Sequence, residues 1–85
     1  MKIDFTVQAA KEYKKLPVII QKKAQNKLHL LIDNYRHPSI QTRKMRGTDK
    51  FEGRIDIHYR FTFIIEGETI VLLSIGMHDA GLGKK

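Results

Sequence analysis

The sequence contains no cysteine, and this absence excludes several kinds of site at once. Disulfide scaffolds, thiolate nucleophiles and cysteine-based zinc sites are all ruled out. A glycine-rich phosphate loop and a serine nucleophile elbow are also missing, so hydrolysis through a covalent intermediate has no support. No apolar run is long enough for a signal peptide or a bilayer-spanning segment. We therefore expect a cytoplasmic protein that does not contact membranes.

Acidic residues are scarce, with 9 Asp and Glu against 16 Lys and Arg, and the formal net charge is +7. Such an excess in a small domain points to a polyanionic partner, and nucleic acid is the first candidate. The alternative is a basic protein whose charge only prevents self-association. The length of 85 residues allows one domain, spanning residues 1–85.

The first half of the chain is patterned for a short strand followed by two helices. Ile3 and Phe5 alternate in a predicted strand, and Thr6 is a suitable N-cap for the first helix. The apolar positions of that helix are Ala9, Ala10, Tyr13 and Leu16. Pro17 suits the start of a second helix, which should end before Pro38. Its apolar positions are Ile20, Ala24, Leu28, Leu31 and Tyr35. We expect the two helices to form a hairpin.

The stretch GRIDIHYRFTFIIEGETIVLLSIGMHD, residues 53–79, predicts a β-hairpin that turns at Gly67. Its odd positions from 55 to 65 are apolar and alternate like a continuous strand. If Ile65 pairs with Thr69, the apolar side chains of the second strand join the same face. This pairing requires the three-residue loop Glu66-Gly67-Glu68. The same register places Arg60 opposite Ser74, with His78 on the face of Arg60.

The four histidines lack the spacing of metal ligands, so we expect neither a metal nor a cofactor. RNA cleavage needs neither a metal nor a nucleophilic side chain, because a 2′-hydroxyl of the RNA can attack its adjacent phosphate. A base must take the hydroxyl proton, cations must stabilise the phosphate oxygens, and an acid must protonate the departing 5′-oxygen. The residues that supply these groups are Glu52, Arg54, Arg60, His78 and Asp79. A solvated sheet face with ordinary ion pairs is the alternative reading of the same residues.

Three stretches resemble the RelE/ParE superfamily of toxins from bacterial toxin–antitoxin pairs. They are AAKEYKKLP, RKMRGTDKFEGRID followed by HYRFTF, and VLLSIGMHD, and the resemblance covers nearly the whole chain. It implies an α+β fold with the order β-α-α-β-β-β, in which a helical hairpin packs on one face of a small antiparallel sheet. It also implies a tight turn near Asp56-Ile57-His58, where the periodicity predicts a continuous strand.

The RelE-like branch of this superfamily cleaves mRNA on the ribosome with scattered basic residues. The resemblance assigns Arg54 and Arg60 to such a catalytic site, and it assigns proton transfer to His78 in SIGMHD. Glu52 is the fourth candidate and stands where some relatives carry lysine. The aromatic residue that stacks on a base in several relatives has no counterpart in the segment AGLGKK.

Together with the chemistry of these residues, the resemblance implies the toxin of a type II toxin–antitoxin system, acting as a metal-independent, ribosome-dependent endoribonuclease. A ParE-like toxin that inhibits gyrase and an inactive basic nucleic-acid-binding module are the alternatives. The proton roles of Glu52, His58 and Asp79 stay open. The expected partners are a cognate antitoxin, in a hetero-oligomer, together with the ribosome and mRNA.

Two further groups of residues are predicted to bind these partners. Lys44, Arg46 and Lys50 precede the hairpin and should contact RNA phosphates, unless they only form a solvated basic loop. Ile64, Ile70 and Leu72 fall outside the main core in the predicted register. They should bind the antitoxin through exposed apolar surface, and packing in a second small core is the alternative.

Overall fold

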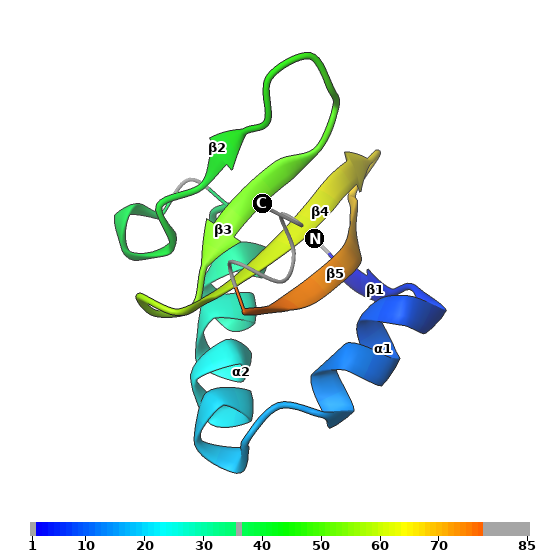
Figure 1. The fold of residues 1–85 in the computed structure, drawn as a ribbon. Coiled ribbons are helices and arrows are strands. Elements are labelled where there is room, and N and C mark those ends of the chain that lie inside the picture. Colours follow the sequence, from blue (N-terminus) through cyan, green and yellow to red (C-terminus); the bar gives the residue numbers. More distant parts are fainter. Residues whose placement is uncertain (1, 36, 78–85) are drawn as a thin grey trace.

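The computed structural model describes residues 2–35 and 37–77 of the chain. The elements are β1 (Lys2–Phe5), α1 (Val7–Lys14), α2 (Val18–Asp33), the 3-10 turn η1 (Pro38–Ile40), β2 (Arg43–Lys44), β3 (Phe51–Arg54), β4 (Tyr59–Glu66) and β5 (Thr69–Met77). The strands form one sheet in the order β1-β5-β4-β3-β2, and both helices lie on one side of it (Figure 1). The predicted fold is confirmed in element order and in the one-sided helical hairpin. The sheet is mixed, because β1 runs parallel to β5 while the other neighbours are antiparallel.

The predicted helix boundaries follow from local chemistry. The hydroxyl of Thr6 accepts a hydrogen bond from the backbone N–H of Ala9 at 3.1 Å, so the predicted N-cap is confirmed. Pro17 immediately precedes the first residue of α2, where its missing N–H costs nothing. The second helix ends at Asp33, so Tyr35 packs against the core from the segment that follows the helix.

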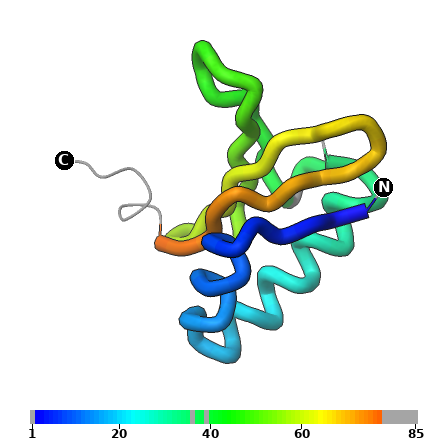
Figure 2. Tube along the Cα trace, turned by 90° about the vertical axis from the view of Figure 1, so that its right-hand side faces the viewer, coloured from blue at the N-terminus to red at the C-terminus, as the bar shows by residue number. Residues whose placement is uncertain are grey.

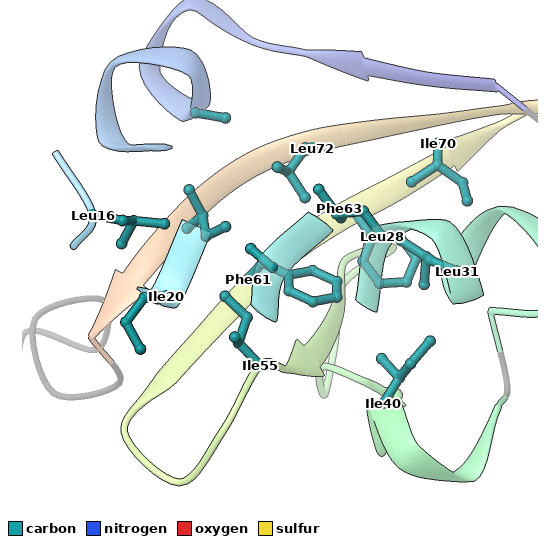
Figure 3. Packing of buried hydrophobic residues seen from close by; sticks show 13 residues of the cluster. Leu16, Ile20, Leu28, Leu31, Ile40, Ile55, Phe61, Phe63, Ile70 and Leu72 are labelled. Atoms are coloured by element: carbon teal, nitrogen blue, oxygen red, sulfur yellow. The ribbon is translucent and has the colours of Figure 1, made fainter. Parts of the chain in front are cut away.

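The hydrophobic core lies between the two helices and the sheet (Figure 3). Side chains of α2 face the aromatic rings of β4, and η1 closes the end of the core with Ile40. The buried apolar residues are Ala9, Leu16, Ile20, Ala24, Leu28, Leu31, Ile40, Ile55, Phe61, Phe63, Ile70, Leu72 and Ile75. The apolar positions predicted for α2 are thus confirmed within its bounds.

Gly53 is required by the close approach of β3 to the core, which gives a first prediction. A Cβ atom at this position would lie 2.5 Å from the ring of Phe61 and 2.9 Å from Ile40. Because Phe61 is almost completely buried, its ring has little room to retreat. Gly53→Ala should therefore lower the free energy of unfolding by about 1–3 kcal/mol in urea denaturation. Gly76→Ala is the matched control, since no described atom lies within 4 Å of a Cβ there. Equal stabilities of the two variants would contradict this account.

The β4–β5 hairpin turns more tightly than the sequence predicts. Glu66 pairs with Thr69 and Ile65 with Ile70, so the loop consists of Gly67 and Glu68 alone. Gly67 has φ of +62°, and glycine is favoured as the first residue of such a two-residue loop. The predicted three-residue loop and its Ile65–Thr69 pairing are wrong.

A β-bulge in β5 reconciles this tight turn with a continuous core. Phe63 pairs with Leu72 but Thr62 pairs with Ser74, so Leu73 is an extra residue without a partner across the ladder. The extra residue reverses the alternation of β5, so Ile70, Leu72 and Ile75 all face the core. The prediction that Ile70 and Leu72 lie outside the main core is wrong for this reason.

The same register shift changes the partner of Arg60. Past the bulge, Arg60 pairs with Gly76, and the predicted pairing with Ser74 is wrong. Ile64 remains partly exposed and pairs with Val71 near the turn, on the sheet face opposite the helices. Ile64 is thus the one member of the predicted apolar group that lies outside the core.

Helix α1 holds the bulge in place. The parallel ladder of β1 ends where Phe5 pairs with Leu72, and the chain then turns into the helix. The hydroxyl of Thr6 donates to the carbonyl oxygen of Leu73 at 3.2 Å. The carboxylate of Glu12 accepts the backbone N–H of Ile75 at 2.9 Å. Side chains of α1 and its cap thus satisfy backbone groups of β5 beyond the end of β1.

Candidate functional site

Charged residues gather on the sheet face that the helices leave uncovered. Side chains alternate along a strand, so the neighbours of the buried Phe61 and Phe63 project to the opposite side. We call this side the open face and define its polar part by Arg43, Glu52, Arg54, Arg60, Thr62, Ser74 and Gly76. These residues come from four neighbouring strands, so the pairing of β2 to β5 brings together positions up to 33 residues apart in the chain, from Arg43 to Gly76.

Glu52 is at the centre of the open face and is only 7% exposed. Its Oε1 atom lies 3.2 Å from Nη1 of Arg60, which donates a hydrogen bond to it. The same oxygen lies 3.5 Å from Nε of Arg43. One carboxylate oxygen therefore serves two guanidinium groups.

Arg54 and Arg60 pair directly across strands β3 and β4. Like charges at directly opposed positions repel each other. The Nε atoms of both arginines are buried and have no acceptor among the described residues. Buried donors are normally satisfied, so these two Nε–H groups are exceptions within residues 2–35 and 37–77.

The described residues of the open face carry a net positive charge. Three arginines, at positions 43, 54 and 60, surround one carboxylate, and Glu52 is the only described acid in a salt bridge with any of them. Guanidinium groups present several N–H donors in one plane, which matches the oxygens of a phosphate. The arrangement is therefore suited to binding a phosphate group.

Gly76 leaves space beside Arg60. It is the cross-strand partner of this arginine, and no described atom lies within 4 Å of where its Cβ would be. On the next ladder step the hydroxyl groups of Thr62 and Ser74 hydrogen-bond to each other. A ligand could therefore approach Arg60 over Gly76 without displacing any described side chain.

The predicted catalytic residues divide into two groups. The pairing of β3 with β4 brings Glu52, Arg54 and Arg60 together on the open face, and their catalytic role stays a prediction. His78 lies outside the described residues, and so does Asp79. Arg43 was not predicted, because its place beside Glu52 depends on the pairing of β2 with β3.

A tight turn at residues 55–58 connects β3 to β4 beside the arginine pair. The carboxylate of Asp56 accepts hydrogen bonds from the backbone N–H groups of His58 at 2.8 Å and Tyr59 at 3.0 Å. Lys23 of α2 lies 3.6 Å from the other oxygen of Asp56. The turn implied by the family resemblance is confirmed, and the continuous strand predicted from periodicity is wrong. No glycine is needed because the aspartate side chain closes the turn.

The contacts of Asp56 make the stability of this turn dependent on pH. Partial burial alone would raise the pKa of Asp56, but the two backbone N–H groups and Lys23 outweigh it and lower the pKa below its ordinary value. A lowered pKa in the folded state stabilises the fold at pH values above the unfolded pKa. This stabilisation is lost as the pH falls through the folded pKa.

Asp56→Asn should therefore cost stability at neutral pH but not in strong acid. The amide oxygen still accepts both backbone hydrogen bonds, so only the charge is removed. We expect a loss of at most about 1 kcal/mol near pH 7, because the pair with Lys23 is partly solvated. Urea unfolding at a series of pH values measures the difference between the two proteins. A difference that persists unchanged in acid would contradict the assigned pKa direction.

The β2–β3 connection carries the predicted RNA-binding residues. It projects from the sheet as a hairpin, drawn in green in Figure 2, and the backbone N–H of Met45 closes it by donating to the carbonyl oxygen of Lys50. Lys44, Arg46 and Lys50 are all exposed, and none forms a salt bridge with a described acid. Arg43 immediately precedes this hairpin, so the cations of the hairpin extend the positive surface of the open face.

Neither metal binding nor membrane crossing finds support in the described ranges 2–35 and 37–77. There, no three His, Asp or Glu side chains are grouped closely enough to hold a metal ion. Neither α1 nor α2 is long and apolar enough to cross a membrane.

Comparisons with known proteins identify the fold. No protein-family model and no curated protein matches the sequence. Among solved structures, the YoeB/ParE toxin from Agrobacterium tumefaciens is similar at a TM-score of 0.81 and 14% identity, covering 92% of this chain and 99% of that one. A chain of the YoeB–YefM complex from Staphylococcus aureus is similar at 0.78 and 21% identity, covering 92% and 97%. A chain of the intact E. coli RelBE toxin–antitoxin complex is similar at 0.75 and 22% identity, covering 89% and 94%. The chain therefore has the fold of RelE and YoeB.

Proposed function

We propose that this chain, which has the RelE/YoeB fold, is the toxin of a type II toxin–antitoxin system and cleaves mRNA on the ribosome. The observation that carries the proposal is the opposed pair Arg54 and Arg60, whose buried Nε atoms lack an acceptor among the described residues, on an open and positively charged sheet face. The similar structures include RelE and YoeB toxins and their complexes. A cytoplasmic site of action follows from the proposed substrate.

The proposed reaction needs no metal ion. The ribose 2′-oxygen attacks the adjacent phosphorus, and the bond from phosphorus to the 5′-oxygen breaks. A base takes the 2′-hydroxyl proton, and an acid gives a proton to the departing 5′-oxygen. Arg54 and Arg60 stabilise the negative charge that grows on the phosphate oxygens. We assign the acid or base step to His78, whose imidazole can gain or lose a proton near neutral pH.

The projecting hairpin supplies a second part of the proposed interface. We expect Lys44, Arg46 and Lys50 to contact RNA phosphates outside the catalytic site. Their exposed side chains can neutralise phosphates and release bound counterions, which makes binding dependent on salt.

Replacing Lys44 and Arg46 together with alanine should weaken ribosome association and flatten its dependence on salt. For every phosphate that is no longer neutralised, the slope of log affinity against log salt becomes shallower by somewhat less than one unit, roughly 0.7 to 0.9. Filter binding at several salt concentrations measures that slope. The control is the double variant Lys11→Ala, Lys14→Ala, which removes the same charge from the surface of α1. Equal slopes for the two double variants would remove the hairpin from the interface.

A cognate antitoxin is the second proposed partner, since several similar structures are toxin–antitoxin complexes. The partly exposed pair Ile64 and Val71 forms the apolar end of the open face. An antitoxin segment bound there would lie on the same sheet face as the arginines. Such a segment could block access of RNA to the site while remaining bound to apolar surface.

Mapping mRNA ends after incubation with translating ribosomes tests the proposed function. Discrete cuts within codons at the decoding site would support it. Intact mRNA together with inhibited gyrase would favour the ParE-like alternative. Intact mRNA with active gyrase would leave a binding module as the better description.

A further inference from the structure

Glu52 is an unusual neighbour for a phosphate site, because it places negative charge where the proposed substrate must bind. Its carboxylate is buried between two arginines and shares a single oxygen between them. A buried carboxylate is costly unless it is paired, and the two guanidinium groups supply that pairing. The sites of phosphate binding and of carboxylate binding therefore share the side chain of Arg60.

We propose that Glu52 is an internal counter-ion, which holds the guanidinium of Arg60 in the empty site and yields it to the phosphate group of RNA. The inference rests on the proposed function only for the identity of the phosphate carrier. The exchange itself needs neither RNA nor the ribosome, because any phosphate can take the place of the Glu52 carboxylate on Arg60. Glu52 is therefore a positioning residue that sets how tightly the arginines bind an anion.

The position of Arg43 makes the exchange physically reasonable. If Arg60 were the only partner of Glu52, binding of Arg60 to a phosphate would leave the buried charge of Glu52 uncompensated. Arg43 lies 3.5 Å from the same carboxylate oxygen, and its side chain is 75% exposed, so it remains available to Glu52 throughout. Arg60 is only 22% exposed and is fixed in the sheet beside Arg54. The exposed arginine can therefore retain the carboxylate while the more buried arginine binds the phosphate.

The exchange has a measurable consequence for anion affinity. In the wild-type chain a phosphate must compete with Glu52 for Arg60 and must also approach a negative charge. Glu52→Gln keeps the size and one acceptor oxygen of the side chain but removes the charge. The three arginines would then have no internal counter-ion, so the affinity of the open face for phosphate should rise.

Titration of inorganic phosphate into the free protein tests this inference, with the Nε–H resonance of Arg60 followed by NMR. We expect Glu52→Gln to bind phosphate about tenfold more tightly than the wild type, which corresponds to the removal of one nearby unit charge in a partly screened environment. The control is Glu66→Gln, which makes the same change at an exposed position beside the Gly67 turn. Because that charge is remote and solvated, its removal should change affinity by less than about twofold.

Unchanged or weaker phosphate binding by Glu52→Gln would overturn the inference, because a purely structural carboxylate would misplace Arg60 when altered. If Glu52→Gln does not fold, the wild type decides the question through the side-chain carboxyl resonances. Saturation with phosphate should then move the resonance of Glu52 and leave that of Glu66 in place, and a static Glu52 resonance would overturn the exchange.

Neither measurement involves ribosomes or RNA. If Glu52→Gln binds phosphate more tightly than the wild type but the wild type leaves mRNA intact, the counter-ion inference stands and the ribonuclease function is refuted. If the wild type cleaves mRNA but Glu52→Gln does not bind phosphate more tightly, the ribonuclease function stands and the counter-ion inference is refuted.

Discussion

Replacing Arg60 with alanine should lower the single-turnover rate of mRNA cleavage by about 10²- to 10³-fold, the usual cost of removing a donor that stabilises charge in the transition state. Arg60 is fixed on the open face by Glu52 and lies beside Arg54, so its guanidinium is held in place before the substrate arrives. Ribosome affinity should change little, because the projecting hairpin retains its cations. Rapid-quench measurements with saturating toxin separate the rate from binding.

Arg60→Lys is the informative companion to this variant. It retains the positive charge but lacks the planar set of donors, and an ammonium group cannot replace a bidentate guanidinium. We expect its rate to lie closer to that of Arg60→Ala than to that of the wild type. A wild-type rate for both variants would remove Arg60 from the catalytic site.

His78 belongs to the same prediction, although it lies outside the described residues. His78→Ala should lower the cleavage rate by about 10²- to 10⁴-fold, the range for loss of a general acid or base. His78→Gln preserves hydrogen bonding but cannot transfer a proton, so it should be nearly as slow. Cleavage at the wild-type rate by His78→Gln would refute the assignment of proton transfer to this residue.

Leu72→Glu should prevent stable folding, because Leu72 is 0% exposed in the core between sheet and helices. Truncating a buried leucine to alanine already costs about 2–5 kcal/mol, and an unpaired buried carboxylate adds to that cost. A domain of this size has only about 5–10 kcal/mol of total stability. We expect the variant to lack a cooperative urea transition by circular dichroism.

Val71→Glu is the matched control for Leu72→Glu, since the adjacent side chain projects from the opposite, partly exposed face. It should fold, and it should weaken antitoxin binding if the apolar end of the open face is the antitoxin contact. A folded Leu72→Glu together with an unfolded Val71→Glu would show that the register of β5 is wrong.

The difference between residues 71 and 72 shows where the sequence was a reliable guide and where it was not. The two helices were predictable because their signals are local, as with the cap at Thr6 and the apolar spacing along α2. The register of β5 was not, because alternation assumes a regular strand. The bulge is held by hydrogen bonds from Thr6 to Leu73 and from Ile75 to Glu12, and each joins residues more than 60 positions apart in the chain. No local pattern records such a contact.

The candidate site was predictable to a similar extent. Arg54 and Arg60 could be identified from residue types and the family resemblance, and the structure brings them together. The position of Arg43 beside Glu52 depends on a strand of two residues with no apolar alternation to predict it. The turn that places both arginines side by side depends on hydrogen bonds to the carboxylate of Asp56. An aspartate alone does not distinguish such a turn from a strand.

The parallel pairing of β1 with β5 has a consequence for the timing of synthesis. A ribosome makes β1 and α1 first, but the backbone groups to which they bind lie in residues 68–75, near the end of the described chain. Until that strand has emerged, the N-terminal segment has no sheet partner, and Arg60 lacks its neighbour Gly76. Domains of this kind complete their fold only when distant segments are both available. A nascent chain therefore cannot assemble the complete open face before residues 69–76 have emerged from the ribosome.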